Sequence, residues 1–161
     1  MGDSIGNKEL GRIEAPASMD HWERFIDFAT DHIHRAIADE SRAYKLKLAY
    51  EELISNIIRA ANGNRSTPDR PVTLEVSMML RDEEGEPWLV LRTSDTGIQF
   101  NPNFNQRAPV DTDQPVIERK IGGLGIFLIE QSVDKVSYDW LNGNNVYELY
   151  MACNSTLAEN P

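Results

Sequence analysis

The chain has 161 residues and a mass of 18.2 kDa, enough for one domain with a single hydrophobic core. Its 16 Lys and Arg against 26 Asp and Glu leave a formal net charge of −10, which argues against DNA or RNA binding, because such binding depends on neutralised phosphates. No apolar run reaches the roughly 20 residues of a membrane span, and the start, MGDSIGNKEL, lacks the features of a secretory signal. Cys153 is the single cysteine, which excludes a disulfide framework. A cytoplasmic protein is therefore expected.

Hydrophobic periodicity predicts a strand and two helices in the amino-terminal half. A leader is expected over residues 1–7, followed by a weakly alternating strand over 8–15. Apolar residues then recur at helical spacing over 19–37, and again over 41–62, which includes the run YKLKLAYEELISNIIRAAN. Both stretches are therefore predicted to be amphipathic helices that bury one face in the core.

The ends of these two helices carry capping signals. Ser18 or Asp20 is the expected N-cap of the first helix, because Asp20 and Glu23 have the spacing of a capping box. Ser41 is expected to cap the second helix. The pair Asn62-Gly63 is expected to end it, because glycine adopts the left-handed conformation there without steric cost.

The carboxy-terminal half is predicted to hold two β-hairpins with a helix between them. In chain order the expected elements are strands at 72–80 and 88–94, a helix at 122–132, and strands at 135–141 and 146–152 around the turn Asn142-Gly143. Residues 98–121 follow neither period, and so long a stretch inside a compact domain is usually functional or disordered. This order predicts an α/β fold, more closely an α+β two-layer sandwich in which a mainly antiparallel mixed sheet carries helices on one face.

The second helix places two polar side chains on one side. Glu52 and Asn56 are four residues apart and therefore share a helix face. A carboxylate there could accept a proton from an attacking hydroxyl, and the amide oxygen could ligate Mg²⁺. The plain alternative is an exposed Glu and an Asn bonded to the backbone, which this pair alone favours.

A second group of chemical interest, Asp95-Thr96-Gly97, ends the strand expected at 88–94. Asp95 has the same parity as Leu89 and Leu91, so it extends the inner row and points a carboxylate between sheet and helices. That carboxylate suits an exocyclic amine such as the N6 group of adenine, and Gly97 leaves room for a flat base to approach the backbone. Taken alone, the three residues equally suit an ordinary turn.

A glycine-rich motif, Lys120-Ile121-Gly122-Gly123-Leu124-Gly125-Ile126, leads directly into the third helix. Its glycines leave backbone N–H groups free to contact phosphate oxygens, aided by the positive end of the following helix. It is not a P-loop, because no Gly-Lys-Ser or Gly-Lys-Thr follows. A flexible hinge is the alternative for this motif in isolation.

Together, these three motifs resemble the nucleotide-binding motifs of the GHKL (Bergerat-fold) ATPases. The Glu52 to Asn56 helix matches the N box, Asp95-Thr96-Gly97 the first glycine box, and Gly123-Leu124-Gly125 the second. The short chain, with its second box running GGLGIFLIEQSVDKVSY, is most similar to the anti-sigma-factor serine/threonine-protein kinase branch. The resemblance implies a single ATP-binding domain over 8–152, followed by a loose tail over 153–161.

The resemblance also implies a role for each motif. Glu52 would be the catalytic base, Asn56 would hold Mg²⁺ between the phosphates, and Asp95 would read adenine beside Gly97. The backbone of 122–126 (Gly122, Gly123, Leu124, Gly125 and Ile126) would wrap the phosphates of ATP.

An ATP lid is implied over residues 100–121, with Arg119 or Lys120 near the γ-phosphate. Two positions depart from the family pattern. Many relatives carry His where this chain has Ala60, and relatives often place Thr beside adenine where this chain offers Asn144 or Asn145.

The family's substrate is a STAS-domain antagonist protein phosphorylated on Ser or Thr, and its other partner is often a sigma factor. The resemblance therefore implies a regulatory protein kinase. A nucleotide-gated binding module without kinase activity is the alternative. Homodimerisation is a further expectation, because Trp88 and Val90 have outward parity on their strand and would give the outer sheet face an apolar surface.

Overall fold

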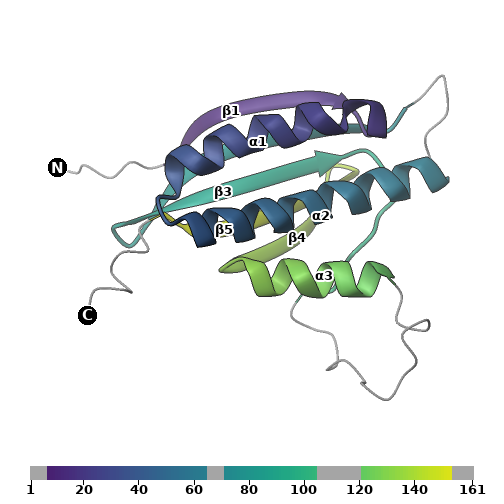
Figure 1. The fold of residues 1–161 in the computed structure, drawn as a ribbon. Coiled ribbons are helices and arrows are strands. Elements are labelled where there is room, and N and C mark those ends of the chain that lie inside the picture. Colours follow the sequence, from purple (N-terminus) through teal and green to yellow (C-terminus); the bar gives the residue numbers. More distant parts are fainter. Residues whose placement is uncertain (1–6, 65–70, 105–120, 154–161) are drawn as a thin grey trace, which may run out of the picture.

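The computed structural model describes residues 7–64, 71–104 and 121–153, and in these ranges it contains five strands, three α-helices and one short 3₁₀ helix. Figure 1 shows the helices running across the sheet. In chain order the elements are β1 (Asn7–Pro16), η1 (Met19–His21), α1 (Trp22–Ala36), α2 (Glu40–Asn64), β2 (Thr73–Glu83), β3 (Glu86–Asp95), α3 (Ile121–Ser132), β4 (Lys135–Leu141) and β5 (Asn144–Ala152). Each predicted element is present, with ends shifted by a few residues. No helix in these ranges is both long and apolar enough to cross a membrane.

The strands form one sheet in the order β1-β2-β3-β5-β4, and every neighbouring pair is antiparallel. The predicted mixed sheet is therefore corrected to an antiparallel one. The last hairpin joins the sheet through β5, which pairs with β3 and leaves β4 at the edge. In this register Asp95 at the end of β3 lies opposite Asn145 at the start of β5.

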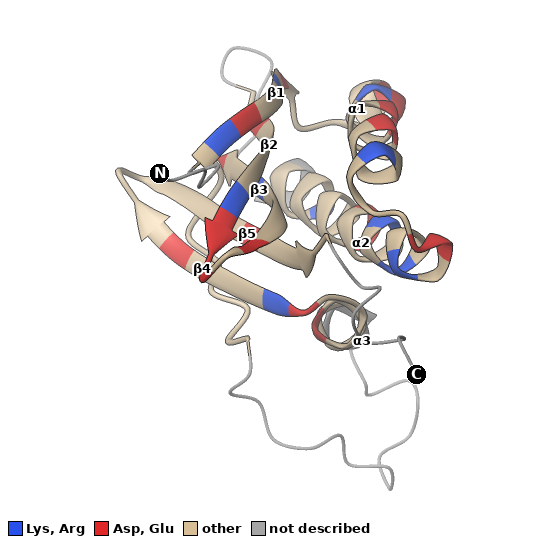
Figure 2. Ribbon diagram, turned by 90° about the vertical axis from the view of Figure 1, so that its left-hand side faces the viewer, with Lys and Arg blue, Asp and Glu red and all other residues tan. Residues whose placement is uncertain are grey.

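All three α-helices lie on one face of the sheet, as predicted, and Figure 2 shows this two-layer arrangement. The core forms between the layers, where α2 contributes a continuous apolar stripe. Its fully or nearly fully buried members include Leu46, Ala49, Tyr50, Leu53, Ile54, Ile57 and Ile58. The inner rows of the central strands are buried as the alternation predicted: Leu74, Val76 and Met78 on β2, and Leu89, Leu91 and Thr93 on β3.

The helix caps differ from the prediction. Asp39 Oδ1, rather than a Ser41 oxygen, accepts a hydrogen bond from Arg42 N at 3.0 Å at the start of α2. The helix begins one residue before Ser41, so that Asp39 occupies the flanking position from which a side chain can cap. The first long helix starts only at Trp22, and no side chain caps it, because the 3₁₀ turn η1 precedes it. At its other end α2 continues to Asn64, past the predicted stop.

The outer face of the sheet also differs from the prediction. Val90 alternates with the core residues of β3, so it lies on the outer face and outside the core cluster. It is nevertheless fully buried. Trp88, on the same row, is only half-buried; the Lys135 ammonium lies 4.9 Å from its ring centroid, and the Tyr150 ring packs edge-on at 6.5 Å. The prediction that Trp88 and Val90 give the outer face an exposed apolar surface is therefore wrong. Long polar and aromatic side chains cover this face.

Candidate functional site

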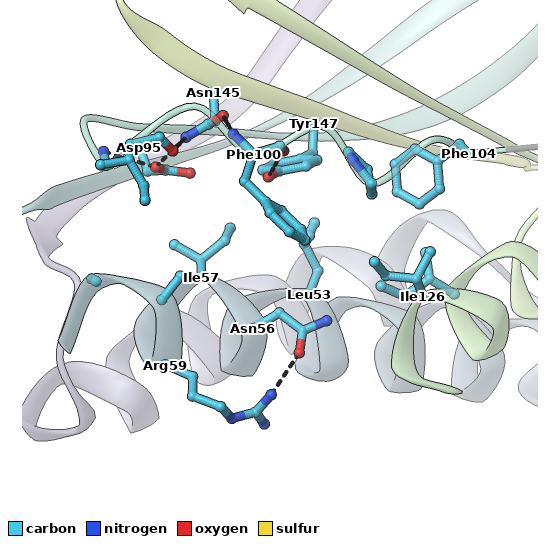
Figure 3. Close-up of a pocket in the computed structure, with 16 residues that line it drawn as sticks. Leu53, Asn56, Ile57, Arg59, Asp95, Phe100, Phe104, Ile126, Asn145 and Tyr147 are labelled. Atoms are coloured by element: carbon cyan, nitrogen blue, oxygen red, sulfur yellow. Dashed lines mark hydrogen bonds between the residues drawn. The ribbon is translucent and has the colours of Figure 1, made fainter. Parts of the chain in front are cut away.

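A cavity of about 230 Å³ opens between the end of the β3–β5 pair and helices α2 and α3 (Figure 3). Its lining comes from segments far apart in the sequence: Leu53, Asn56, Ile57, Arg59, Ala60 and Ala61 of α2; Asp95, Gly97, Ile98, Phe100, Pro102 and Phe104 at and after the end of β3; Ile126 and Ile129 of α3; and Asn145 and Tyr147 of β5. Residues of all three motifs singled out in the sequence thus line one pocket.

Asp95 provides a buried acceptor at one wall of this pocket. The Asp95 residue is 4% exposed. Its Oδ1 accepts hydrogen bonds from Gly97 N at 2.9 Å and from Asn145 Nδ2 at 3.0 Å. No described residue donates a hydrogen bond to Oδ2, which leaves that oxygen available to a donor in the pocket. Burial raises the pKa of the Asp95 carboxyl, and the bonds from Asn145 and Gly97 partly offset this.

Gly97 is required by its surroundings in a way that the sequence did not indicate. A Cβ atom at this position would lie 3.0 Å from Asp95 Oδ1 and 3.8 Å from Val72 Cγ1. Any side chain here would therefore crowd the carboxylate that Gly97 N itself binds. The absence of a side chain preserves the geometry of Asp95 as well as space at the pocket wall.

Asn145, not Asn144, belongs to the pocket. The Asn145 residue is 2% exposed and pairs with Asp95 across the two strands. Asn144 points the other way, and its Nδ2 donates to Ser94 Oγ at 3.2 Å on the opposite row. The register between β3 and β5 settles a choice that the sequence left open.

Aromatic side chains that the sequence analysis did not single out form much of the remaining wall. Phe104 is nearly buried, with its ring edge-on to Tyr147 at 6.5 Å between centroids, while Phe100 is 49% exposed. The Tyr147 hydroxyl donates to Phe100 O at 2.9 Å, which ties the segment after β3 to β5. The sequence could have indicated Tyr147, because it lies two residues after Asn145 and therefore on the same face of β5. A mostly apolar pocket with few polar groups suits a flat aromatic ligand.

The helical side of the pocket carries the Glu52 and Asn56 pair. Asn56 is half-buried and lines the pocket, and its Oδ1 accepts a hydrogen bond from the Arg59 guanidinium at 2.9 Å (Figure 3). Glu52, one turn earlier, does not line the pocket itself. Its carboxylate lies where a side chain at Gly125 of α3 would be, so that Gly125 is the residue that leaves room for it.

The glycine-rich motif is partly inside the described chain. Gly122, Gly123 and Leu124 belong to the first turn of α3, and Ile126 in the second turn lines the pocket. Arg119 and Lys120 lie outside the described residues, as does residue range 105–120 of the expected lid. The described parts of the three motifs therefore meet around one cavity, with Glu52 and Gly125 in contact beside it.

Comparison with known proteins agrees with this geometry. A family model described as a histidine kinase-like ATPase domain matches residues 15–151. The chain belongs to this family.

It is also 31% identical over 103 residues to the serine-protein kinase RsbW of Listeria monocytogenes serovar 1/2a, an alignment that covers 63% of this chain and 60% of that relative. The chain therefore spans less than two thirds of the length of the relative. Membership of the histidine kinase-like ATPase family confirms the GHKL resemblance, and the similarity to a serine-protein kinase supports the anti-sigma-factor kinase branch.

Proposed function

We propose that the protein is an ATP-dependent serine/threonine kinase of the anti-sigma-factor type, which phosphorylates a STAS-domain antagonist protein and has a sigma factor as its second partner. One observation carries the proposal: Asn56, Asp95 and Ile126, from three separate motifs, line a single pocket, and Glu52 contacts Gly125 beside it. Family membership and similarity to a serine-protein kinase support the same activity.

The adenine base would lie between the sheet and α2, where the pocket is apolar. Asp95 Oδ2 would accept a hydrogen bond from the exocyclic amine, and the aromatic rings of Phe104 and Tyr147 would pack near the base. A buried acceptor that must be paired discriminates strongly between ligands, because a ligand without the matching donor leaves it unsatisfied. Asp95 would thus favour adenine over guanine, which presents a carbonyl oxygen at the equivalent position.

The triphosphate would extend from the pocket toward the start of α3. The first N–H groups of a helix have no intrahelical partner, and in α3 these include the N–H groups of residues 121–123. Asn56 Oδ1 would exchange its hydrogen bond from the Arg59 guanidinium for Mg²⁺, a hard cation that amide oxygens ligate. No cluster of three or more His, Cys, Asp or Glu side chains occurs in the described ranges, so the remaining ligands would be phosphate oxygens and water. Arg119 or Lys120 would approach the γ-phosphate.

Glu52 would act as the general base toward the substrate hydroxyl. When bound, Mg²⁺-ATP supplies the phosphoryl group and the charge neutralisation, so the protein's task is mainly positioning. Glu52 lies one helical turn from Asn56, the residue proposed to hold the metal, and its carboxylate lies beside Gly125 of α3. It would accept the hydroxyl proton as the oxygen attacks the γ-phosphorus and the bond from the γ-phosphorus to the bridging oxygen breaks, which releases ADP.

The test is transfer of labelled γ-phosphate from ATP to a purified STAS-domain partner. Replacing Glu52 with Gln keeps the size of the side chain and removes the base, so transfer should fall about 10²- to 10⁴-fold while the affinity for ATP stays unchanged. Glu51→Gln is the matched control, because Glu51 is also half-buried on α2 but faces Lys47 at 4.0 Å rather than α3. Transfer by Glu52→Gln at the parental rate would remove Glu52 as the base.

The same experiment separates a kinase from a nucleotide-gated binding module. A module without chemistry would capture its partner in the presence of ATP, transfer no label, and be unaffected by Glu52→Gln. That outcome would retain the pocket as an ATP site and overturn the kinase activity.

A further inference from the structure

We propose that Asn145 is a positioning residue, which presents the Asp95 carboxylate to adenine and holds the chain after β3 in place without contacting the base itself. The proposal rests on the proposed function only in taking the ligand to be an adenine nucleotide. It differs from the pattern expected of relatives, in which a residue of the last strand lies beside the base.

The carboxamide of Asn145 has no hydrogen-bonding capacity left for a ligand. Its Nδ2 donates to Asp95 Oδ1 at 3.0 Å and to Ile98 O at 2.8 Å. Its Oδ1 accepts from Phe100 N at 2.9 Å and from the Tyr138 hydroxyl at 2.7 Å. An asparagine amide has two donor hydrogens and two acceptor lone pairs, so all four are used.

These partners also fix which way the amide faces. A carboxylate and a backbone carbonyl can only accept, and the N–H of Phe100 can only donate. Reversing the amide would set oxygen against oxygen at Asp95 and at Ile98. Because Asn145 is 2% exposed, water cannot replace these bonds without opening the wall of the pocket.

The arrangement determines which oxygen of Asp95 is offered to a ligand. Gly97 N and Asn145 Nδ2 both donate to Oδ1, at 2.9 and 3.0 Å, and these two bonds resist rotation of the carboxylate. Oδ2 receives no hydrogen bond from the described part of the chain and belongs to a residue that lines the pocket. Asn145 therefore acts on the base through Asp95.

The same side chain holds the aromatic edge of the pocket. It binds the backbone of Ile98 and Phe100, and Tyr147, two residues further along β5, donates to Phe100 O at 2.9 Å. The start of β5 thus fixes both the acceptor for the base and the position of the chain that carries Phe100 (Figure 3). Loss of Asn145 would loosen both together.

Two ionisable groups on neighbouring strands interact electrostatically with Asp95. Tyr147 of β5 and Tyr138 of β4 have pKa values raised by burial, so both are neutral near neutral pH. Arg59 of α2 lines the pocket and is exposed, while β2 places the apolar Leu74 opposite Asp95. Loss of the Asn145 donor would therefore act directly on the carboxylate, because a hydrogen bond to the charged form favours ionisation.

The experiment is calorimetric titration of the full chain with non-hydrolysable ATP and GTP analogues over a series of pH values. Asn145→Ala should weaken the ATP analogue about tenfold and reduce its advantage over the GTP analogue. It should also raise the pH at which acid reduces binding of the ATP analogue by half (the acid midpoint), because Asp95 loses a donor that favours its charged form. Asn145→Asp should move the midpoint further, since a second carboxylate then faces the first.

Asn144→Ala is the matched control, because Asn144 is the next residue but faces Ser94 on the other row. Its affinity, selectivity and midpoint should equal those of the parent. If Asn145→Ala does not fold, Tyr138→Phe removes only one partner of the Asn145 amide at the sheet edge, and it should shift the midpoint in the same direction by less.

The outcomes separate the two proposals. Lower affinity with an unchanged midpoint and unchanged selectivity would make Asn145 merely structural and overturn the inference. Parental affinity in Asn145→Ala would overturn it as well. Failure of the parent protein to bind the ATP analogue would instead overturn the proposed function.

Discussion

The two sides of the pocket are built in different ways. On the sheet side, Asp95 and Asn145 are almost completely buried, and hydrogen bonds from two strands and the following chain hold them. On the helical side, Asn56 is half-buried with one hydrogen bond from the exposed Arg59, and Glu52 depends on the space left by Gly125. The sheet side is organised before a ligand arrives, whereas the helical side is positioned by the packing of α2 against α3.

This difference separates binding from chemistry. Recognition of a base benefits from a rigid acceptor, because little ordering is left to do when the ligand binds. Transfer of a phosphoryl group depends on placing one carboxylate correctly against a substrate from another protein. Changes on the helical side should therefore alter transfer more than binding, and changes on the sheet side should alter binding first.

Among the substitutions that test this comparison, Gly125→Ala is expected to have the largest effect. A Cβ atom at this position would overlap the Glu52 carboxylate and displace it from the contact between α2 and α3. A displacement of about 1 Å at a reacting group can lower a rate about 10²-fold. Transfer of labelled phosphate should fall by about this factor, while calorimetry with an ATP analogue should give an affinity close to that of the parent.

Gly85→Ala is the control for a general loss of stability. Gly85, in the turn between β2 and β3, has a positive φ of 84° and nothing within 4 Å of an added Cβ. The substitution strains the turn but leaves the pocket intact, so transfer should continue at the parental rate. If both alanine variants lost transfer equally, the steric explanation at Gly125 would fail.

On the sheet side, Asp95→Asn should weaken binding of an ATP analogue about tenfold to a hundredfold, because a hydrogen bond to a charged acceptor is lost. It should also change how stability depends on pH. Burial raises the pKa of the Asp95 carboxyl, so the folded protein binds a proton at higher pH than the unfolded chain, whose Asp pKa is about 3.9. The free energy of unfolding of the parent should therefore rise relative to that of Asp95→Asn as the pH falls from about 7 to about 4.

Chemical unfolding of both proteins across this pH range measures the second effect. An opposite slope would mean that the carboxylate is stabilised, rather than destabilised, by its surroundings. Asp139→Asn, at an exposed position of β4, serves as the binding control and should leave the affinity for the ATP analogue unchanged.

The smallest effect is expected at Thr93, on the inner row of β3 two residues before Asp95. Thr93 is fully buried, and its Oγ1 has no hydrogen-bond partner in the described part of the chain. Thr93→Val keeps the shape and removes an unsatisfied hydroxyl, so the free energy of unfolding should rise by about 1 kcal/mol. Thr30→Val, which deletes a hydroxyl that donates to Ile26 O at 2.8 Å, should give no such gain. Loss of stability in Thr93→Val would show that Oγ1 is bonded.

Much of the fold and part of the site followed from periodicity alone. Alternation along β3 correctly placed Asp95 on the inner row, and a spacing of four placed Glu52 and Asn56 on one side of α2. The role of Gly125 did not follow, because it depends on how closely α3 approaches Glu52. Such approaches are set by tertiary packing, which a local pattern does not contain.

The pairing partner of Asp95 could not be predicted for a similar reason. Asn144 and Asn145 are adjacent, and a shift of one residue in register exchanges the faces of a strand. The strong turn signal Asn142-Gly143 is compatible with either choice. The cap of α2 was missed because both Asp39 and Ser41 are good capping residues, and only the first helical residue decides between them.

The covered outer face of the sheet has a consequence for association. Glu148 Oε2 lies 3.7 Å from Arg81 Nη2 and 3.4 Å from Arg92 Nη1. Arg81 also donates a hydrogen bond to the Tyr150 hydroxyl at 2.7 Å. Val90, on the same outer row of β3, is fully buried although the helices lie on the other face of the sheet (Figure 2). A molecule that docked there would meet ion pairs rather than apolar surface, so the part of its affinity that comes from its own charges should weaken as the ionic strength rises.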